Sequence, residues 1–286
     1  MADTCICTLL YGRPLYYEIG RRAVVSMLRK TNFDIFLAVE RGTSPILNLK
    51  PSSRLHIEPL LGELPPAFHR AFPFLLKFRA LLACLHHTSA EQILLMDADT
   101  LIVADIRTRD VQNALNGHDF GMVEQTTITN SSMTRKDFLS HYNRHTLAWF
   151  DPSVRPPSLD NFRFYNSGVV LGKHGAFESL VDWAIAAIAS KKSNHQVGNH
   201  MIADQDYFQY WTNSLRPDSC QTLPWTWNHC QHWDRGFPDT RALVLHFSNF
   251  CKGPDRLHQI RMVYYNHLLN LKTLLTRGRK DSCQPL

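Results

Sequence analysis

The first forty residues alternate between extended and helical patterns, and this alternation constrains the fold more than any other feature of the chain. Residues 4–10 are rich in β-forming side chains, residues 15–30 place apolar side chains at helical spacing, and residues 34–40 form a second apolar run. A strand, a helix and a strand in this order favour a parallel pair joined by a crossover helix. We therefore expect an α/β fold with a mixed, mostly parallel central sheet flanked by helices.

Later segments continue the alternation. Strands are expected at 55–60, 93–96, 164–171 and 243–247, and helices at 75–86, 177–190 and 257–275. One stretch, 126–160, is polar, aromatic and rich in proline, without a clear period. A long irregular stretch inside a compact domain is more often a binding loop or lid than a filler. With no internal repeat and no convincing linker, 286 residues are expected to form one domain.

Composition narrows the class of protein. The hydrophobic fraction of 44% and the charged fraction of 20% are typical of a globular domain, and the apolar runs are too short to span a membrane. The N-terminus carries an acid where a signal peptide would carry positive charge, so we expect a cytoplasmic protein. The seven cysteines are an odd number without CxxC spacing, which favours reduced thiols.

The net charge of +6 raises the question of an anionic partner. Positive residues are scattered, and their densest cluster is the tail Arg277, Arg279 and Lys280. A solvated tail is the first interpretation, and no nucleic-acid partner is expected. The alternatives are a polyanionic ligand, such as a nucleoside diphosphate, and peripheral contact of the basic tail with an anionic membrane.

The segment Gln92–Val103 ends an apolar strand with two acids, Asp97 and Asp99, one residue apart. In an extended segment these side chains point to the same face. The carboxyl ends of strands are where open α/β sheets bind ligands, and paired carboxylates suit Mg²⁺ or Mn²⁺. A bare Asp-x-Asp is more often a solvated turn, so the rest of the chain must decide.

Five segments carry further short motifs in a fixed order. They are Leu76-Lys77-Phe78 leading into Leu94–Leu101, Phe164–Val169, Ala203–Phe208, Leu223–Asn228 and His246–Pro254. In this order they resemble glycosyltransferase family 8, the retaining enzymes that include glycogenin and bacterial lipopolysaccharide galactosyltransferases. Two departures from the family pattern fall in the last segment, where Asn249 replaces a glycine and Gly253-Pro254 replaces Pro-Trp.

The resemblance implies a single GT-A, Rossmann-like domain over residues 1–286. Residues 1–125 would form the nucleotide-binding half, and 126–256 the donor and acceptor half with the irregular loop 126–160. Residues 257–286 would form a C-terminal helix and the basic tail. The implied activity is metal-dependent transfer of a sugar from a UDP-sugar to a glycan or other hydroxyl acceptor, with retention of configuration.

The resemblance also implies residue roles. Asp97, Asp99 and His246 would hold Mn²⁺ or Mg²⁺, and Lys252 would grip the diphosphate. The other implied contacts with the nucleotide are Thr8, Leu10, Tyr11, Ala98 and Asn249.

A second group of residues would surround the donor sugar. Asn166-Ser167-Gly168 would lie beside the sugar, where glycine permits close approach. Lys77 would approach the sugar from its helix. Asp204 would orient sugar hydroxyls or stabilise positive charge. Gln205 is the candidate for a weak nucleophile if retention runs through a covalent enzyme intermediate rather than by front-face internal return. Asp206 is expected to be structural.

Two other functions stay open. A sugar-1-phosphate nucleotidyltransferase also uses paired acids and a metal, but it carries a glycine-rich phosphate loop after the first strand. Here the segment Tyr11-Gly12-Arg13-Pro14 is short and has one glycine. A basic membrane- or RNA-binding protein with a degenerate transferase fold would be expected to lose Asp99 or His246, and both are present.

Overall fold

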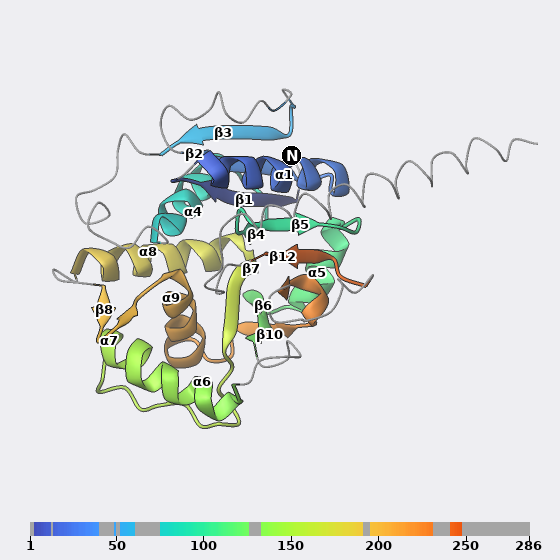
Figure 1. Ribbon diagram of the computed structural model, residues 1–286. Helices are drawn as coiled ribbons and strands as arrows, with labels where there is room; N and C mark the ends of the chain where they lie inside the picture. Colours follow the sequence, from blue (N-terminus) through green and yellow to red (C-terminus); the bar gives the residue numbers. More distant parts are fainter. Residues whose placement is uncertain are drawn as a thin grey trace, which may run out of the picture.

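The computed structural model describes residues 3–12, 14–39, 49, 52–60, 75–125, 133–190, 195–230 and 241–247. Within this part of the chain, seven strands form a central sheet in the order β10-β6-β7-β4-β1-β2-β3. Their bounds are β1 (Thr4–Leu10), β2 (Asp34–Val39), β3 (Leu55–Pro59), β4 (Gln92–Met96), β6 (Phe120–Glu124), β7 (Tyr165–Lys173) and β10 (Cys220–Leu223). The main helices are α1 (Pro14–Lys30), α4 (Leu76–His87), α5 (Thr108–Leu115), α8 (His174–Ser190) and α9 (Asp204–Tyr210) (Figure 1).

The sheet is mixed and mostly parallel. β1 pairs in parallel with β2 and β4, β2 with β3, and β10 with β6. β7 is antiparallel to both of its neighbours, β4 and β6. The predicted fold class is therefore confirmed, and the β1–α1–β2 opening has the expected parallel register from Cys5 opposite Asp34 to Leu10 opposite Val39.

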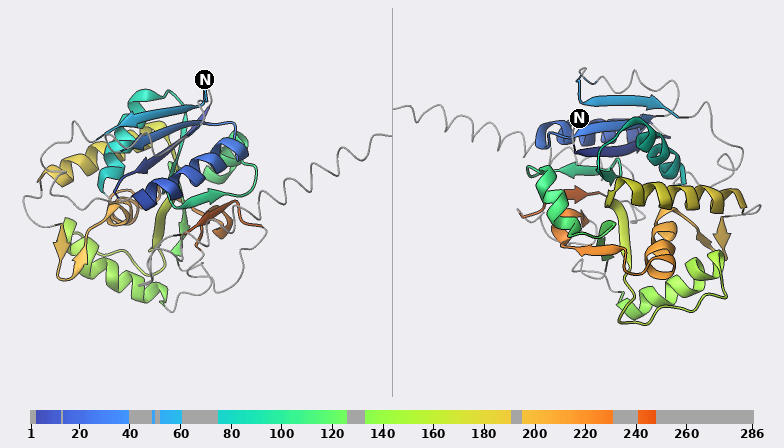
Figure 2. Two further views of the ribbon diagram at one scale, coloured as in Figure 1. Left: turned by 45° about the horizontal axis from the view of Figure 1, so that its top comes forward. Right: turned by 180° about the vertical axis from the view of Figure 1, so that it is seen from behind.

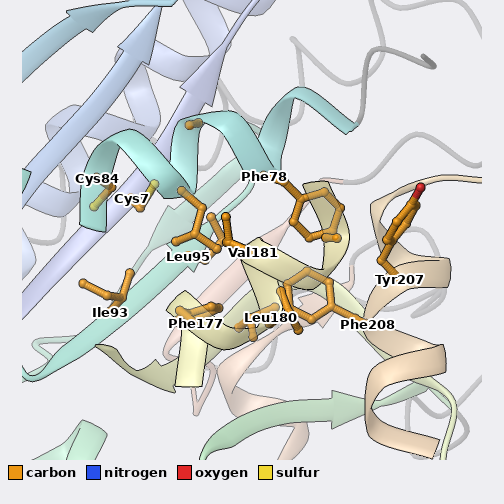
Figure 3. Packing of buried hydrophobic residues seen from close by; sticks show 14 of the residues in the cluster. Cys7, Phe78, Cys84, Ile93, Leu95, Phe177, Leu180, Val181, Tyr207 and Phe208 are labelled. Carbon is orange, nitrogen blue, oxygen red and sulfur yellow. The ribbon is translucent and has the colours of Figure 1, made fainter. Parts of the chain in front are cut away.

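Helices cover both faces of the sheet because successive strand residues point to opposite sides. In β1, Cys5 and Cys7 belong to the core under α4 and α8, whereas Ile6 and Leu10 belong to the core under α1 and α5. Figure 3 shows the first of these cores at close range. Its labelled side chains come from the sheet, α4, α8 and α9: Cys7, Ile93, Leu95, Phe78, Cys84, Phe177, Leu180, Val181, Tyr207 and Phe208.

A small second sheet lies beside the end of β4. It consists of β5 (Thr100–Ile102), β12 (Val244–His246) and β11 (His229–Cys230), with β12 in the middle. β12 is antiparallel to β5 and parallel to β11. Both views in Figure 2 show β5 (green) and β12 (red-brown) side by side. The expected strand at 243–247 is thus present, and it lies beside the residues that directly follow Asp99.

The expectation of an irregular stretch over 126–160 is wrong for residues 135–150. These residues form α6 (Arg135–His141), a π-helical segment (Tyr142–Leu147) and α7 (Ala148–Phe150). A capping box starts the helix: Thr134 Oγ1 accepts a hydrogen bond from Asp137 N, and Asp137 Oδ2 accepts one from Thr134 N. The helix is further stabilised because its apolar side chains pack with Phe162 and Phe164 in a separate cluster.

Several predicted segments lie outside the described residues. They are the C-terminal helix 257–275, the basic tail and the loop positions Asn249 and Lys252. Among the helices that the structure does describe, none has the length and apolar character needed to cross a membrane.

Candidate metal and donor site

Asp97, Asp99 and His246 come together at one end of the sheet, where β4, β5 and β12 meet (Figure 1). One ligand atom of each residue lies within 4.8 Å of the other two. His246 Nε2 is 3.4 Å from Asp99 Oδ1 and 3.7 Å from Asp97 Oδ2. The histidine is buried and the two carboxylates are half-buried. These residues can hold a metal ion.

The acids converge for a different reason from the one expected. Asp97 and Asp99 lie in the turn between β4 and β5, not on an extended segment. Backbone hydrogen bonds hold this turn from both sides: Asp97 N donates to Gly168 O at 2.8 Å, and Phe247 N donates to Asp99 O at 2.9 Å. Strands β7 and β12 therefore determine where the carboxylates lie.

A chain of hydrogen bonds orients the His246 ring. Gly168 N donates to Asn166 Oδ1 at 2.9 Å, so that oxygen is an acceptor, and Asn228 Nδ2 donates to it at 2.8 Å. The opposite atom of the amide, Asn228 Oδ1, therefore faces His246 Nδ1 at 3.0 Å. Because an amide oxygen only accepts, Nδ1 carries the hydrogen, and Nε2 is the ring nitrogen that faces the two carboxylates. Cys230 Sγ also lies 3.5 Å from Nδ1.

The residues fit a divalent metal. His246 Nε2 is buried and makes no hydrogen bond with good geometry within the described part of the chain. An imidazole lone pair and two carboxylates form a mixed nitrogen and oxygen donor set, which suits Mn²⁺ better than Mg²⁺ because Mg²⁺ prefers oxygen ligands. Metal-bound histidines commonly donate their other ring N–H to a fixed acceptor, as Nδ1 does here to Asn228.

Gly168 makes room for this histidine. A Cβ added at residue 168 would lie 2.5 Å from His246 Nδ1 and 2.8 Å from Nε2, and nearer still to Cε1. No side chain can occupy that space without moving the ring. Gly168 therefore lets the metal-site histidine approach the backbone, and the close approach of a sugar at this residue stays a prediction.

Lys77 joins the metal cluster to a second group of polar residues. Its Nζ lies 2.6 Å from Asp97 Oδ1, forms an ion pair with Asp204 Oδ2, and donates to Ser167 O at 3.3 Å. Ser167 Oγ donates to the same Asp204 oxygen at 2.9 Å. Lys77 lies in the first turn of α4, and Asp204 is the first residue of α9. The cation therefore bridges one metal-site carboxylate and one carboxylate outside the metal cluster.

Electrostatics keep the lysine charged. Burial lowers the pKa of Lys77, but Asp204 and Asp97 raise it by more, so the net pKa is above the ordinary value. Burial raises the pKa of Asp97, and Lys77 opposes that change. Burial, followed by the charge of Asp204, raises the pKa of Tyr11.

The remaining predicted residues lie as follows. Thr8 and Leu10 are buried near the end of β1, and Leu10 packs against Gly20. Gln205 Nε2 is 3.4 Å from Gln125 Oε1 at the end of β6, a long hydrogen bond. Ala98 occupies the turn between the two metal-site acids.

Two residues of the site were not predicted from the sequence. Asn228 and Cys230 contact His246, and Asn228 is fully buried. Asn228 ends the fourth motif, Leu223–Asn228, which is the signal that marked this segment. No local pattern indicates that its amide would contact a histidine from a distant strand.

Comparisons with known proteins do not identify the site, so its interpretation rests on its geometry. No protein-family model matches this chain, and no curated protein matches it significantly. The described residues thus establish an α/β fold with a cluster of two aspartates and a histidine that can hold a metal ion.

Proposed function

We propose that this protein is a metal-dependent glycosyltransferase of the family 8 type, which moves a sugar from a UDP-sugar to a glycan or other hydroxyl acceptor. The observation that carries the proposal is the direct contact of Lys77 with both Asp97 and Asp204. That contact places a buried cation and a second carboxylate beside residues that can hold a metal. A glycosyl transferase needs these groups together because negative charge develops on the diphosphate and positive charge on the sugar.

The metal cluster suits the diphosphate group of a UDP-sugar donor. When bound to Asp97, Asp99 and His246, Mn²⁺ or Mg²⁺ would supply positive charge for the diphosphate leaving group. Lys77 would add a fixed charge on the sugar side of that group. Lys77 is only 8% exposed, so water screens its charge weakly and its electrostatic effect is large.

The polar residues around Asp204 suit the sugar of the donor. Its carboxylate is held by Lys77 and by the Ser167 hydroxyl, which leaves it oriented before any sugar binds. In this proposal Asp204 accepts hydrogen bonds from sugar hydroxyls or stabilises positive charge at the anomeric carbon. Gln205, the next residue, is the proposed weak nucleophile. Asn166 would support the site indirectly, because its side chain contacts Asn228 and Gly168 N.

We propose retention of configuration because the proposed roles leave Asp97 and Asp99 on the metal and Asp204 beside the sugar, so none of these three acids serves as a base for inversion. An inverting enzyme needs a carboxylate that removes the proton of the acceptor hydroxyl. Glu124, at the end of β6, is buried, and its two oxygens accept hydrogen bonds from Arg135 at 3.0 and 3.2 Å. The product is expected to keep the α configuration of a UDP-α-sugar. The anomeric proton coupling constant of the fresh product measures this, and a β-linked product would refute retention.

The proposed activity is tested by UDP release from a panel of UDP-glucose, UDP-galactose, UDP-xylose and UDP-galacturonic acid. We expect release from at least one donor with Mn²⁺ and little release after chelation. Asp99→Ala should abolish release, and Asp105→Ala, which removes an exposed acid outside the cluster, should not. Metal-dependent release of pyrophosphate from a nucleoside triphosphate, with no release of UDP, would favour a nucleotidyltransferase instead. No metal-dependent turnover of any donor would contradict the proposal.

A further inference from the structure

Three histidines form a cluster apart from the metal and donor site. His141 ends α6, His145 lies in the π-helical segment, and His200 is in the short strand β9 (His200–Met201). Their ring centroids are 4.7 Å apart for His141 and His145, and 4.8 Å apart for each of the other two pairs. All three side chains are half-buried, so solutes in the solvent can reach them.

A buried carboxylate holds one of these rings. His200 Nε2 lies 3.2 Å from both carboxylate oxygens of Asp206. Asp206 is itself held, because its Oδ1 accepts from Thr146 Oγ1 at 2.5 Å and its Oδ2 accepts from Ala203 N at 3.0 Å. Since a carboxylate accepts, Nε2 of His200 carries the hydrogen, and Nδ1 is the ring nitrogen left to bind a metal. A carboxylate on the far nitrogen is the usual support of a metal-bound histidine.

The environment also favours the neutral form of His141 and His145. Burial, followed by the neighbouring histidines His200 and His145, lowers the pKa of His141 to about 4. Burial likewise lowers the pKa of His145. His145 Nδ1 is buried and has no hydrogen-bond partner among the residues that the structure describes. Tilted and edge-on contacts between the rings explain why the histidines touch. They do not explain why His145 Nδ1 lacks a partner or why Asp206 supports His200. Neutral imidazole is the form that binds a metal.

The ring spacing matches a zinc site. With Zn–N bonds of about 2.0–2.1 Å and tetrahedral angles, the ring centres of three histidine ligands lie roughly 5 Å apart. His141 and His145 are four residues apart, the spacing of the two histidines in helical H-E-x-x-H zinc sites. Among the described residues, only the ligand atoms of Asp97, Asp99 and His246 already face one point, so one histidine ring must turn for zinc to bind. Half a turn about χ2 of His141 exchanges Nδ1 with Cδ2 and Nε2 with Cε1, moves the ring centre little, and leaves the contact of His200 with Asp206 in place.

We propose that His141, His145 and His200 bind one zinc ion, with Asp206 as the supporting carboxylate and solvent in the fourth position. Asp206 and Asp204 both lie in the first turn of α9. Zinc would therefore anchor the start of α9, and with it the carboxylate that contacts Lys77. This inference does not depend on the proposed transferase activity.

The test is a calorimetric titration of the metal-free full chain with Zn²⁺. The Asp99→Asn variant serves as background, because it weakens the other metal cluster. We expect one zinc ion per chain to bind to this cluster. His145→Ala should weaken that binding by at least about 100-fold, because losing a ligand costs no less than losing its support. Asp206→Asn should weaken it about 10- to 100-fold. His86→Ala, at an exposed histidine of α4, is the matched control and should change nothing.

Equal zinc affinity in the His145→Ala variant and its parent would overturn the proposal. If His145→Ala does not fold, X-ray absorption spectroscopy of the zinc-loaded Asp99→Asn protein decides instead. Three imidazole ligands in the first shell are expected. Fewer than three, or an oxygen-only shell, would mean that zinc binds elsewhere or adventitiously, and would also overturn the proposal.

Discussion

Gly168→Ala is the most informative single change, because it adds one methyl group next to a metal-site histidine. The new Cβ would lie 2.5 Å from His246 Nδ1. Non-bonded heavy atoms prefer separations of about 3.5–4.0 Å, so the ring must move by about 1 Å or more. His246 cannot move freely, since it is 2% exposed and its Nδ1 is hydrogen-bonded to Asn228.

A shift of this size removes Nε2 from the metal position. Metal–ligand distances tolerate changes of about 0.2 Å, which is well below the required movement. We expect Mn²⁺ affinity to fall at least about 10-fold, the lower end of the loss seen when the support of a metal ligand is removed. Overpacking should also lower the free energy of unfolding by about 1–3 kcal/mol.

The Gly172→Ala variant separates the loss of Mn²⁺ affinity from the loss of stability. Gly172 lies on the same strand, β7, and its Cβ would be 2.5 Å from Phe177 Cε2 and 2.9 Å from Phe120 Cδ1. The overpacking cost is therefore similar, but the affected side chains belong to the hydrophobic core. Mn²⁺ affinity of this variant should match the wild type.

Free Mn²⁺ is measured by electron paramagnetic resonance during titration, and stability by urea unfolding. The expected displacement of His246 is refuted if Gly168→Ala binds Mn²⁺ as tightly as the wild type. It is also refuted if Gly172→Ala loses metal affinity to the same extent, because a general loss of stability would then explain both results.

Three further changes test other parts of the structure. Asn228→Ala removes the acceptor that orients His246, so Mn²⁺ affinity should fall about 10- to 100-fold in the same titration. An unchanged affinity would contradict the hydrogen bond from His246 Nδ1 to Asn228. Lys77→Met leaves Asp204 as a buried carboxylate without its cation, and the free energy of unfolding measured in urea should fall by about 3–5 kcal/mol. An unchanged free energy of unfolding would argue against the ion pair. Burial lowers the pKa of His195, so its stabilising contribution is full above the ordinary value near 6.5 and is lost as the pH falls through that value. His195→Phe should therefore lose less stability than the wild type between pH 7.5 and pH 5.5, and parallel curves would show that the histidine does not contribute.

The sequence predicts an element well where its apolar residues follow a clear local period. The strand at 4–10 and the helix at 15–30 match β1 and α1 to within one residue at each end. β5, at Thr100–Ile102, was missed because three residues carry no clear period, and their extended conformation depends on pairing with β12. Such pairing is a tertiary effect that no short window of sequence contains.

The helix at 135–150 was missed because its period changes within it. Phe138 and Tyr142 are four residues apart, but the next buried apolar side chain, Leu147, follows after five, through the π-helical segment. A search for a 3.6-residue period loses the pattern at that point. The metal cluster was predictable because motifs marked Asp97, Asp99 and His246. Asn228 was not assigned to the site, because its role depends on contacts between distant segments.

The antiparallel pairing of β5 with β12 also has a consequence for biosynthesis. Asp97 and Asp99 leave the ribosome roughly 150 residues before His246. At about 5–20 residues per second, that interval is roughly 7–30 s of translation. During this time the two carboxylates lie in a nascent chain that does not yet contain His246, the third residue of the cluster. A chain released between Leu223 and His246 would contain all seven strands of the central sheet but would lack the third ligand. Such a truncated product is expected to be folded in large part and unable to bind metal at this site.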